Sequence, residues 1–179
     1  MDWFRLKHTL ALYMTFSAVK RAEYIKKHNI FHHMGNNCMV MFRKIPLYPQ
    51  LISFQDNVWI ASNVSFVTHD VIHSMLNGRS ETKKYTEHID CIDIRENVFV
   101  GANSTILSGV TIGPDVIVGA GSLVNKNLVR GVYAGVPAKY ICSIEEFIEK
   151  KEDFPIKRSK NGLSEETIEM CWERFKKNH

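Results

Sequence analysis

Residues 94–129 read IRENVF-VGANST-ILSGVT-IGPDVI-VGAGSL-VNKNLV, and this stretch decides the fold because one six-residue rule holds throughout it. Each hexad opens with an aliphatic residue, from Ile94 to Val124. The fourth position holds only Asn, Asp or Gly, the residues that most readily adopt a left-handed backbone. The fifth position is small or aliphatic. Two earlier hexads, which start at Phe54 and Ile60, follow the same rule.

A period of six fits neither an α-helix nor a simple alternating strand, and it predicts short strands joined by regular corners. We expect one hexad to form one side and three hexads to form a triangular coil, with the strands of stacked coils parallel. The pattern therefore predicts a mainly β protein built as a parallel β-helix. A sandwich of short strands is the alternative, but sandwiches do not usually repeat one corner column in eight places.

Length and composition indicate a globular protein with one main domain. The chain has 179 residues, of which 45% are hydrophobic, and its net charge of +4 is not gathered into a stripe. This favours a small-molecule ligand and no nucleic acid partner. The apolar run from Leu10 to Val19 is too short for a membrane span, and no signal peptide is evident. The four cysteines show no CxxC spacing, so we expect reduced thiols and a cytoplasmic location.

The order of these patterns predicts three parts. They are an N-terminal helix within residues 1–29, a β-helix over 30–141 with an extended loop at about 70–91, and a C-terminal helical extension over 142–179. Asp2 is placed to cap one helix that runs to about Lys27 and covers the open end of the β-helix. Ser143 and Ser164 are expected to cap two helices of the C-terminal extension.

The hexad rule fails directly after Phe66-Val-Thr-His69, where a polar segment begins that lasts to about Cys91. We expect this segment to be a polar loop that leaves the β-helix at a corner. Long loops in compact domains are often functional, and repeat proteins accept insertions on their binding face. The loop therefore indicates where a functional site should be sought.

The hexads, the Phe66-Val-Thr-His69 run before a loop, and Ala134-Gly-Val-Pro-Ala-Lys139 resemble the hexapeptide-repeat acyltransferases. The resemblance is to the group of maltose, galactoside and xenobiotic O-acetyltransferases and their capsular-polysaccharide relatives, and it covers about residues 51–141. It implies a left-handed β-helix, a homotrimer, and acetyl-CoA bound between adjacent subunits. It also implies an acceptor hydroxyl, first on a sugar or polysaccharide precursor and second on an antibiotic.

Carried over by position, the family's catalytic histidine falls on His69. An imidazole is a suitable general base for an alcohol that attacks a thioester. His73, within the loop, is the closest competitor. The implied coenzyme contacts are backbone groups of small residues along the pantetheine arm and polar residues near the phosphates, namely Ala102, Ala120, Asn125, Lys126 and Lys139. No metal is implied.

Two other functions are compatible with parts of the sequence. A γ-type carbonic anhydrase resembles this fold and binds zinc with three histidines across a subunit interface. His33 and His69 are separated by the length of two coils, and His73 follows within the next turn of chain. However, His33 precedes the regular hexads, and the Gly-Val-Pro-Ala-Lys motif is typical of acyltransferases. The second alternative is a trimeric scaffold without catalytic activity.

Overall fold

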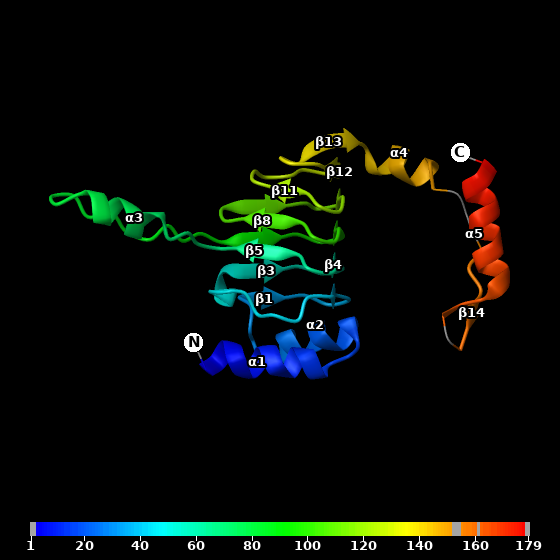
Figure 1. The fold of residues 1–179 in the computed structure, drawn as a ribbon, viewed down its shortest axis with the longest axis horizontal. Coiled ribbons are helices and arrows are strands. Elements are labelled where there is room, and N and C mark those ends of the chain that lie inside the picture. The colour runs from blue at the N-terminus through cyan, green and yellow to red at the C-terminus, as the bar shows by residue number, and fades with distance from the viewer. Residues whose placement is uncertain (1–2, 152–154, 161, 178–179) are drawn as a thin grey trace. The chain divides into compact units, whose positions relative to one another are not determined.

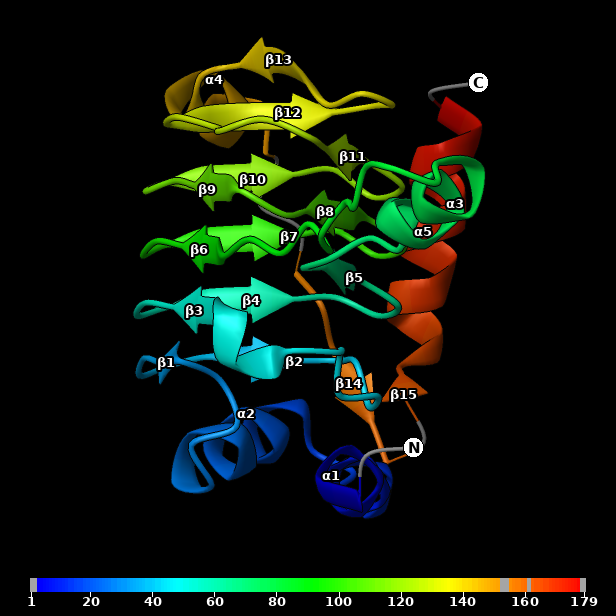
Figure 2. The same cartoon turned by 90° about the vertical axis from the view of Figure 1, so that its left-hand side faces the viewer.

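The computed structural model of the chain describes residues 3–151, 155–160 and 162–177. The chain divides into two compact units, Met1–Phe147 and Ile148–His179. The first unit contains the hexads and three sheets of short strands, stacked in layers (Figure 1, Figure 2). The fold is thus mainly β with flanking helices, as the sequence predicts.

Three sheets form the sides of the stack. Sheet A consists of β1 (His33–Met34), β3 (Ile52–Phe54), β6 (Ile92–Ile94) and β9 (Val110–Ile112). Sheet B consists of β2 (Met39–Val40), β4 (Val58–Ile60), β7 (Val98–Val100), β10 (Val116–Val118), β12 (Gly131–Ala134) and β13 (Lys139–Cys142). Sheet C consists of β5 (Ser65–Val67), β8 (Thr105–Leu107) and β11 (Leu123–Val124). From β3 to β11 the chain visits A, B and C in turn, and these strands pair in parallel.

The strand register confirms that three hexads make one circuit. Val98 lies opposite Val116 and Thr105 lies opposite Leu123, so in each pair the chain advances by three hexads. One circuit lower, Val58 lies opposite Val98, and the longer stretch of chain between them contains the loop inserted after β5. The insertion therefore leaves the register of the coils above and below it intact.

The repeated positions have the predicted environments. The residues that open the eight hexads are all at 0% exposure, namely Phe54, Ile60, Ile94, Val100, Ile106, Ile112, Val118 and Val124. The fifth positions are also buried, including the two polar ones, Ser104 and Ser122. Seven of the eight corners have a positive φ, and Asn127 is the exception among them. Its side-chain oxygen instead accepts a hydrogen bond from the Thr111 N–H.

The N-terminal segment forms two helices, α1 (Trp3–Met14) and α2 (Ala18–Lys27), so the prediction of one continuous helix was wrong. The break has a local cause. The Thr15 side chain donates to the Ala11 carbonyl, and the Ser17 side chain accepts from the Lys20 N–H and caps α2. Such side chains compete with the helix backbone for hydrogen bonds. Both helices lie against the end of the stack (Figure 1). The predicted Asp2 cap lies outside the described residues.

The inserted loop is more ordered than the sequence indicated. It leaves and returns as a short antiparallel pair, in which Asp70 N–H donates to the His88 carbonyl and Asp90 N–H donates to the Thr68 carbonyl. Between them lies α3 (Ile72–Arg79), which the sequence analysis did not predict. Asn77 closes the far end with two hydrogen bonds to the Tyr85 backbone. The loop projects away from the stack (Figure 1).

The predicted caps of the C-terminal helices are present. Ser143 and Glu146 exchange side-chain and backbone hydrogen bonds at the start of α4 (Ile144–Glu149). In the second unit, the Ser164 side chain accepts from the Thr167 N–H at the start of α5 (Glu165–Lys177). Two short strands, β14 (Arg158–Ser159) and β15 (Gly162–Leu163), precede it and were not predicted. No helix in the described part of the chain is both long and apolar enough to span a membrane.

Candidate active site

His69 lies where the inserted loop leaves the stack, directly after β5. Its backbone forms an antiparallel bridge with Ile89, so the loop's returning strand fixes its position. The preceding Thr68 is fully buried and donates a hydrogen bond of 2.9 Å to the Leu47 carbonyl. His69 itself is half-buried. The fold therefore anchors the residues on both sides of this imidazole.

The imidazole of His69 contacts Tyr48 edge to face, with ring centroids 5.2 Å apart. Its Nδ1 is buried and has no hydrogen-bond partner in the part of the chain that the structure describes. The Tyr48 hydroxyl donates to the Glu87 carboxylate at 3.3 Å, which joins the irregular coil before β3 to the returning side of the loop. The negative charge of Glu87, with burial and the hydrogen bond, raises the pKa of Tyr48 above its ordinary value.

The other polar residues of the loop do not join His69. His73 lies in α3, where its Nε2 is 3.2 Å from the Ser74 hydroxyl. Its Nδ1 is buried without a partner among the described residues, like that of His69, but no hydrogen bond or ring contact within them links the two histidines. The Asp70 carboxylate accepts from the Ile72 N–H at the start of α3, whose N-cap residue is Val71. The two histidines thus have different contacts, His69 with Tyr48 and His73 with Ser74.

Ala102 and Ala120 lie one above the other at the corner between sheets B and C. The Gly121 N–H donates to the Ala102 carbonyl at 2.8 Å, which fixes the two corners against each other. The two coils approach closely at this corner, which we call the small-residue wall, because a Cβ on Gly101 would lie 2.4 Å from the Ala120 nitrogen. Both residues are alanines, so no side chain larger than a methyl group covers the backbone at this corner.

The polar candidates lie at the upper end of the stack. Lys139 pairs with Ala134 across β12 and β13, above the corner of Ala102 and Ala120. Asn125 and Lys126 follow β11, at the corner between sheets C and A. All three polar side chains are exposed. Within one chain, the residues implied for the coenzyme thus fall at two different corners.

His69 and the small-residue corner are also separated within one chain. His69 follows β5, whereas the corners of Ala102 and Ala120 precede β8 and β11. They therefore lie at opposite ends of the strands of sheet C, which contain two or three residues each. At about 3.3 Å per residue, three residues span about 10 Å. One chain does not bring the candidate base and this wall together.

The histidines named for a zinc site do not converge within the chain. Among the described residues, no group of three His, Cys, Asp or Glu side chains is placed to bind a metal ion. His33 lies on β1 in sheet A and is exposed, while His69 lies at the base of the loop. The geometry of this chain thus gives the carbonic anhydrase alternative no additional support.

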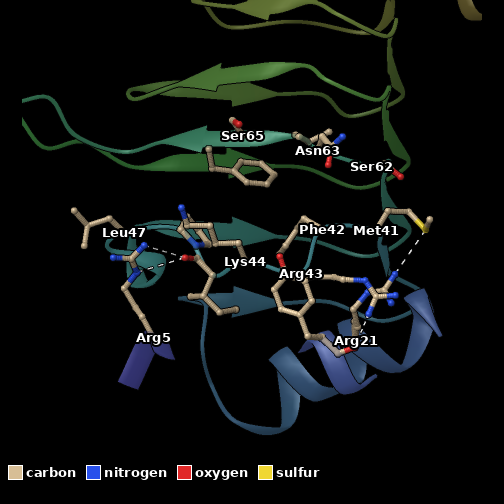
Figure 3. A pocket seen from close by; sticks show the side chains of 15 residues that line it. Arg5, Arg21, Met41, Phe42, Arg43, Lys44, Leu47, Ser62, Asn63 and Ser65 are labelled. Atoms are coloured by element: carbon tan, nitrogen blue, oxygen red, sulfur yellow. Dashed lines mark hydrogen bonds between the residues drawn. The ribbon is translucent and has the colours of Figure 1, made fainter. Parts of the chain in front are cut away.

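Sequence analysis missed a basic cavity beneath β5, next to the N-terminal helices (Figure 3). Its volume is about 670 Å³, and it is lined by Arg5, Arg21, Arg43 and Lys44 among others. These cations come from α1, from α2 and from the segment after β2, so they are dispersed in the sequence. No spacing rule would have grouped them, because they meet only when the helices fold against the first coil.

The stacked strands, the circuit of three hexads and the corner residues with positive φ define a hexapeptide-repeat protein. The family model described as bacterial transferase hexapeptide (six repeats) matches residues 92–126. Protein CapG of Staphylococcus aureus is 38% identical over 151 residues, covering 81% of this chain and 84% of CapG. The chain therefore belongs to the bacterial hexapeptide-repeat transferase family.

Two further proteins that are similar to this chain are galactoside acetyltransferases. Galactoside O-acetyltransferase of Escherichia coli is 34% identical over 116 residues, which cover 64% of this chain and 55% of that protein. The chain thus spans about half the length of that relative. A solved structure of a galactoside acetyltransferase in complex with coenzyme A has a TM-score of 0.55 and 25% identity, and the match covers 86% of this chain and 88% of that one.

Proposed function

We propose that this protein is an acetyl-CoA-dependent O-acetyltransferase that acts on a hydroxyl of a sugar or polysaccharide precursor. The observation that carries the proposal is the position of His69 at the base of the inserted loop, with anchored neighbours and a ring nitrogen that lacks a partner among the described residues. The names of the galactoside acetyltransferase relatives support both the reaction and the donor.

In the proposed reaction, His69 accepts the proton of the acceptor hydroxyl as its oxygen attacks the thioester carbonyl carbon. The carbon–sulfur bond then breaks, and the coenzyme leaves as a thiolate that takes up a proton. General-base catalysis of this kind contributes about 10² to 10⁴ in rate. No covalent enzyme intermediate is needed. The role of the wall is to hold the donor and to donate backbone N–H groups to the developing oxyanion.

We further propose a left-handed β-helix that assembles as a homotrimer with active sites between subunits. The separation of His69 from the Ala102 and Ala120 corner supports this, since one subunit's base would then face another subunit's wall. Lys126 and Lys139 would interact with the coenzyme phosphates as point charges, and Asn125 would lie beside them. Acetyl-CoA as donor is consistent with a cytoplasmic reaction.

Acetyl-CoA binding tests the proposal without knowledge of the acceptor. Calorimetry on the wild type should give a dissociation constant in about the micromolar range, and Lys139→Ala should weaken it about tenfold, because a charge-assisted contact is lost. Lys84→Ala, an equal charge loss in the inserted loop, is the matched control and should bind as the wild type does. Absence of acetyl-CoA binding by the wild type would contradict the proposal.

A further inference from the structure

The basic cavity occupies a gap in the stack. Sheets A and B each have a strand below the first regular coil, namely β1 and β2, but sheet C ends at β5. The segment that would continue sheet C, residues 41–47, bends away toward α1 and α2 and lines the opposite wall. Figure 3 shows Ser62, Asn63 and Ser65 on one side and the cations on the other. The cavity thus has an edge strand as one wall and a cationic surface as the other.

The charge of this cavity is not balanced by the protein. Four cationic side chains line it, and no carboxylate is among the described residues that do so. Arg21 is only 1% exposed, yet its guanidinium donates to neutral acceptors, the carbonyls of Val40, Thr15 and Phe16 and the Met41 sulfur. Buried cations usually have an anionic partner, because removing a charge from water is costly.

Part of this charge has a structural role. Arg21 and Arg43 both donate to backbone carbonyls at and just beyond the end of α1, where four carbonyls lack helical partners. A helix end carries only about half a negative charge, however. Arg43 uses Nη1 for these bonds, and Arg5 uses Nε and Nη2 to bind the Ile45 carbonyl. Among the hydrogen bonds of the described residues, none is donated by Nη2 of Arg43, Nη1 of Arg5 or the exposed Lys44.

The cavity also adjoins the candidate active site. Leu47, which lines it, accepts the hydrogen bond from Thr68, the residue before His69. Tyr48, the next residue, carries the ring that contacts His69. The remaining lining offers hydroxyl and amide groups beside the apolar rings of Phe42 and Phe66, a mixture common in small-molecule sites. Its volume of about 670 Å³ is within the usual range for such sites.

We infer that this cavity binds the anionic group, a phosphate or a carboxylate, of a charged saccharide acceptor. The inference rests on the proposed function and narrows its substrate class from sugars in general to anionic ones. Free guanidinium and ammonium donors would bind the anion, and the side chains of Ser62 and Asn63 at the corner before β5 and of Ser65 on β5 would bind sugar hydroxyls. The hydroxyl to be acetylated would then extend past Leu47 toward His69.

Calorimetry with three probes tests this inference: glucose 1-phosphate, glucuronate and glucose. We expect at least one charged probe to bind about tenfold or more tightly than glucose, and to weaken at high salt. Lys44→Gln should weaken that binding by about fivefold to tenfold and keep acetyl-CoA binding, whereas Lys139→Ala should do the reverse. Comparison of the two charged probes shows whether phosphate or carboxylate is preferred. Arg43→Gln is a poorer variant, since it also removes bonds to α1.

Equal binding of glucose and both charged probes would overturn the inference. So would a Lys44→Gln protein that binds the charged probe no worse than the control Lys84→Gln. Acetyl-CoA binding without selective binding of a charged probe would overturn this inference alone and leave the proposed function intact. Charged-probe binding in a protein that does not bind acetyl-CoA would overturn both the acceptor assignment and the proposed function.

Discussion

Tyr48 and His69, which come from separate coils of the stack, meet edge to face with their ring planes at 78°. Tyr48 lies in the irregular coil below β3, and His69 lies at the base of the inserted loop. The Tyr48 hydroxyl continues the contact to Glu87 on the loop's returning side. The Tyr48 side chain therefore connects its own coil to the base of the loop, which contains His69, and to the returning side of the loop, which contains Glu87.

Replacement of Tyr48 should separate positioning of His69 from general stability. Tyr48→Ala removes the ring packed against the imidazole, and we expect kcat to fall by about 10-fold to 100-fold, since small displacements of a catalytic group are costly. Tyr48→Phe keeps the ring and loses the hydrogen bond to Glu87, so it should restore most of the activity. Steady-state kinetics measure this effect. If Tyr48→Ala and Tyr48→Phe lose activity equally, the ring contact does not position His69.

His69→Ala should lower kcat by about 10² to 10⁴, the usual contribution of a general base. The dissociation constant of acetyl-CoA should stay within about twofold of the wild type, because the interaction lost belongs to the transition state. His73→Ala is the control from the same loop and should lose much less activity. The reverse pattern, with His73→Ala the more damaging variant, would move the general base to α3.

A ladder of side-chain amides runs along one corner of the stack. Asn57 donates to Asn97 at 2.9 Å, and Asn97 donates to Asp115 at 3.1 Å. Asn97 also has a φ of 59°, in the left-handed region. Its side chain and its backbone therefore both stabilise the corner.

Asn97→Ala should lower the free energy of unfolding by about 2 to 4 kcal/mol, from about 1 kcal/mol of left-handed backbone strain and about 0.5 to 1.5 kcal/mol for each of the two lost hydrogen bonds. Asn97→Gly avoids the strain and should recover about 1 kcal/mol of that loss. Urea unfolding at one fixed protein concentration measures both, because assembly makes stability depend on concentration.

Asn103 provides the matched control for this prediction. Its φ is 60°, but it has no side-chain hydrogen bond to another described residue. Asn103→Gly should therefore change the free energy of unfolding by less than about 0.5 kcal/mol. An equal effect of glycine at positions 97 and 103 would show that the ladder does not stabilise the corner.

The stack could be predicted from the hexads because the residue type at each hexad position determines locally whether that position is buried or forms a corner. An aliphatic residue such as Ile112 must be buried, and a residue such as Asp115 must turn the corner, whatever the rest of the chain does. Asn127 shows the limit of this logic, because a hydrogen bond to Thr111 takes the place of the left-handed turn. The helix break at Ser17 also has a local cause, because its side chain competes with the helix backbone for the Lys20 N–H. The helical spacing of apolar residues across the break led to the prediction of one continuous helix.

The candidate site could be predicted only in part. His69 was predicted as the general base from the family resemblance and from its place at the end of a Val-Thr-His run before a loop, and this role stays a prediction. Tyr48 and Glu87 were not found, because their contacts join separate segments of the folded chain. The basic cavity was missed for the same reason, since Arg5 and Arg43 come from different layers. Charges that are dispersed in sequence and gathered in space leave no local pattern.

His8 is a buried residue of α1, and its Nδ1 lies 2.9 Å from the Tyr24 hydroxyl. Burial, followed by the positive charges of His28 and Lys7, lowers the pKa of His8 below its ordinary value. Below that ordinary value, about 6.5, the unfolded chain binds the proton more readily than the folded one. Stability should therefore fall as the pH decreases below about 6.5 and should carry no such penalty above it.

The variant His8→Gln should show a smaller loss of stability on acidification, even if it is less stable than the wild type at neutral pH. The reason is that glutamine cannot take up the proton that the folded state disfavours at this position. Urea unfolding of both proteins between about pH 5 and about pH 7.5 would measure the two slopes, and their difference removes contributions from groups that titrate alike in both. Parallel curves would mean that His8 does not couple protonation to the attachment of α1.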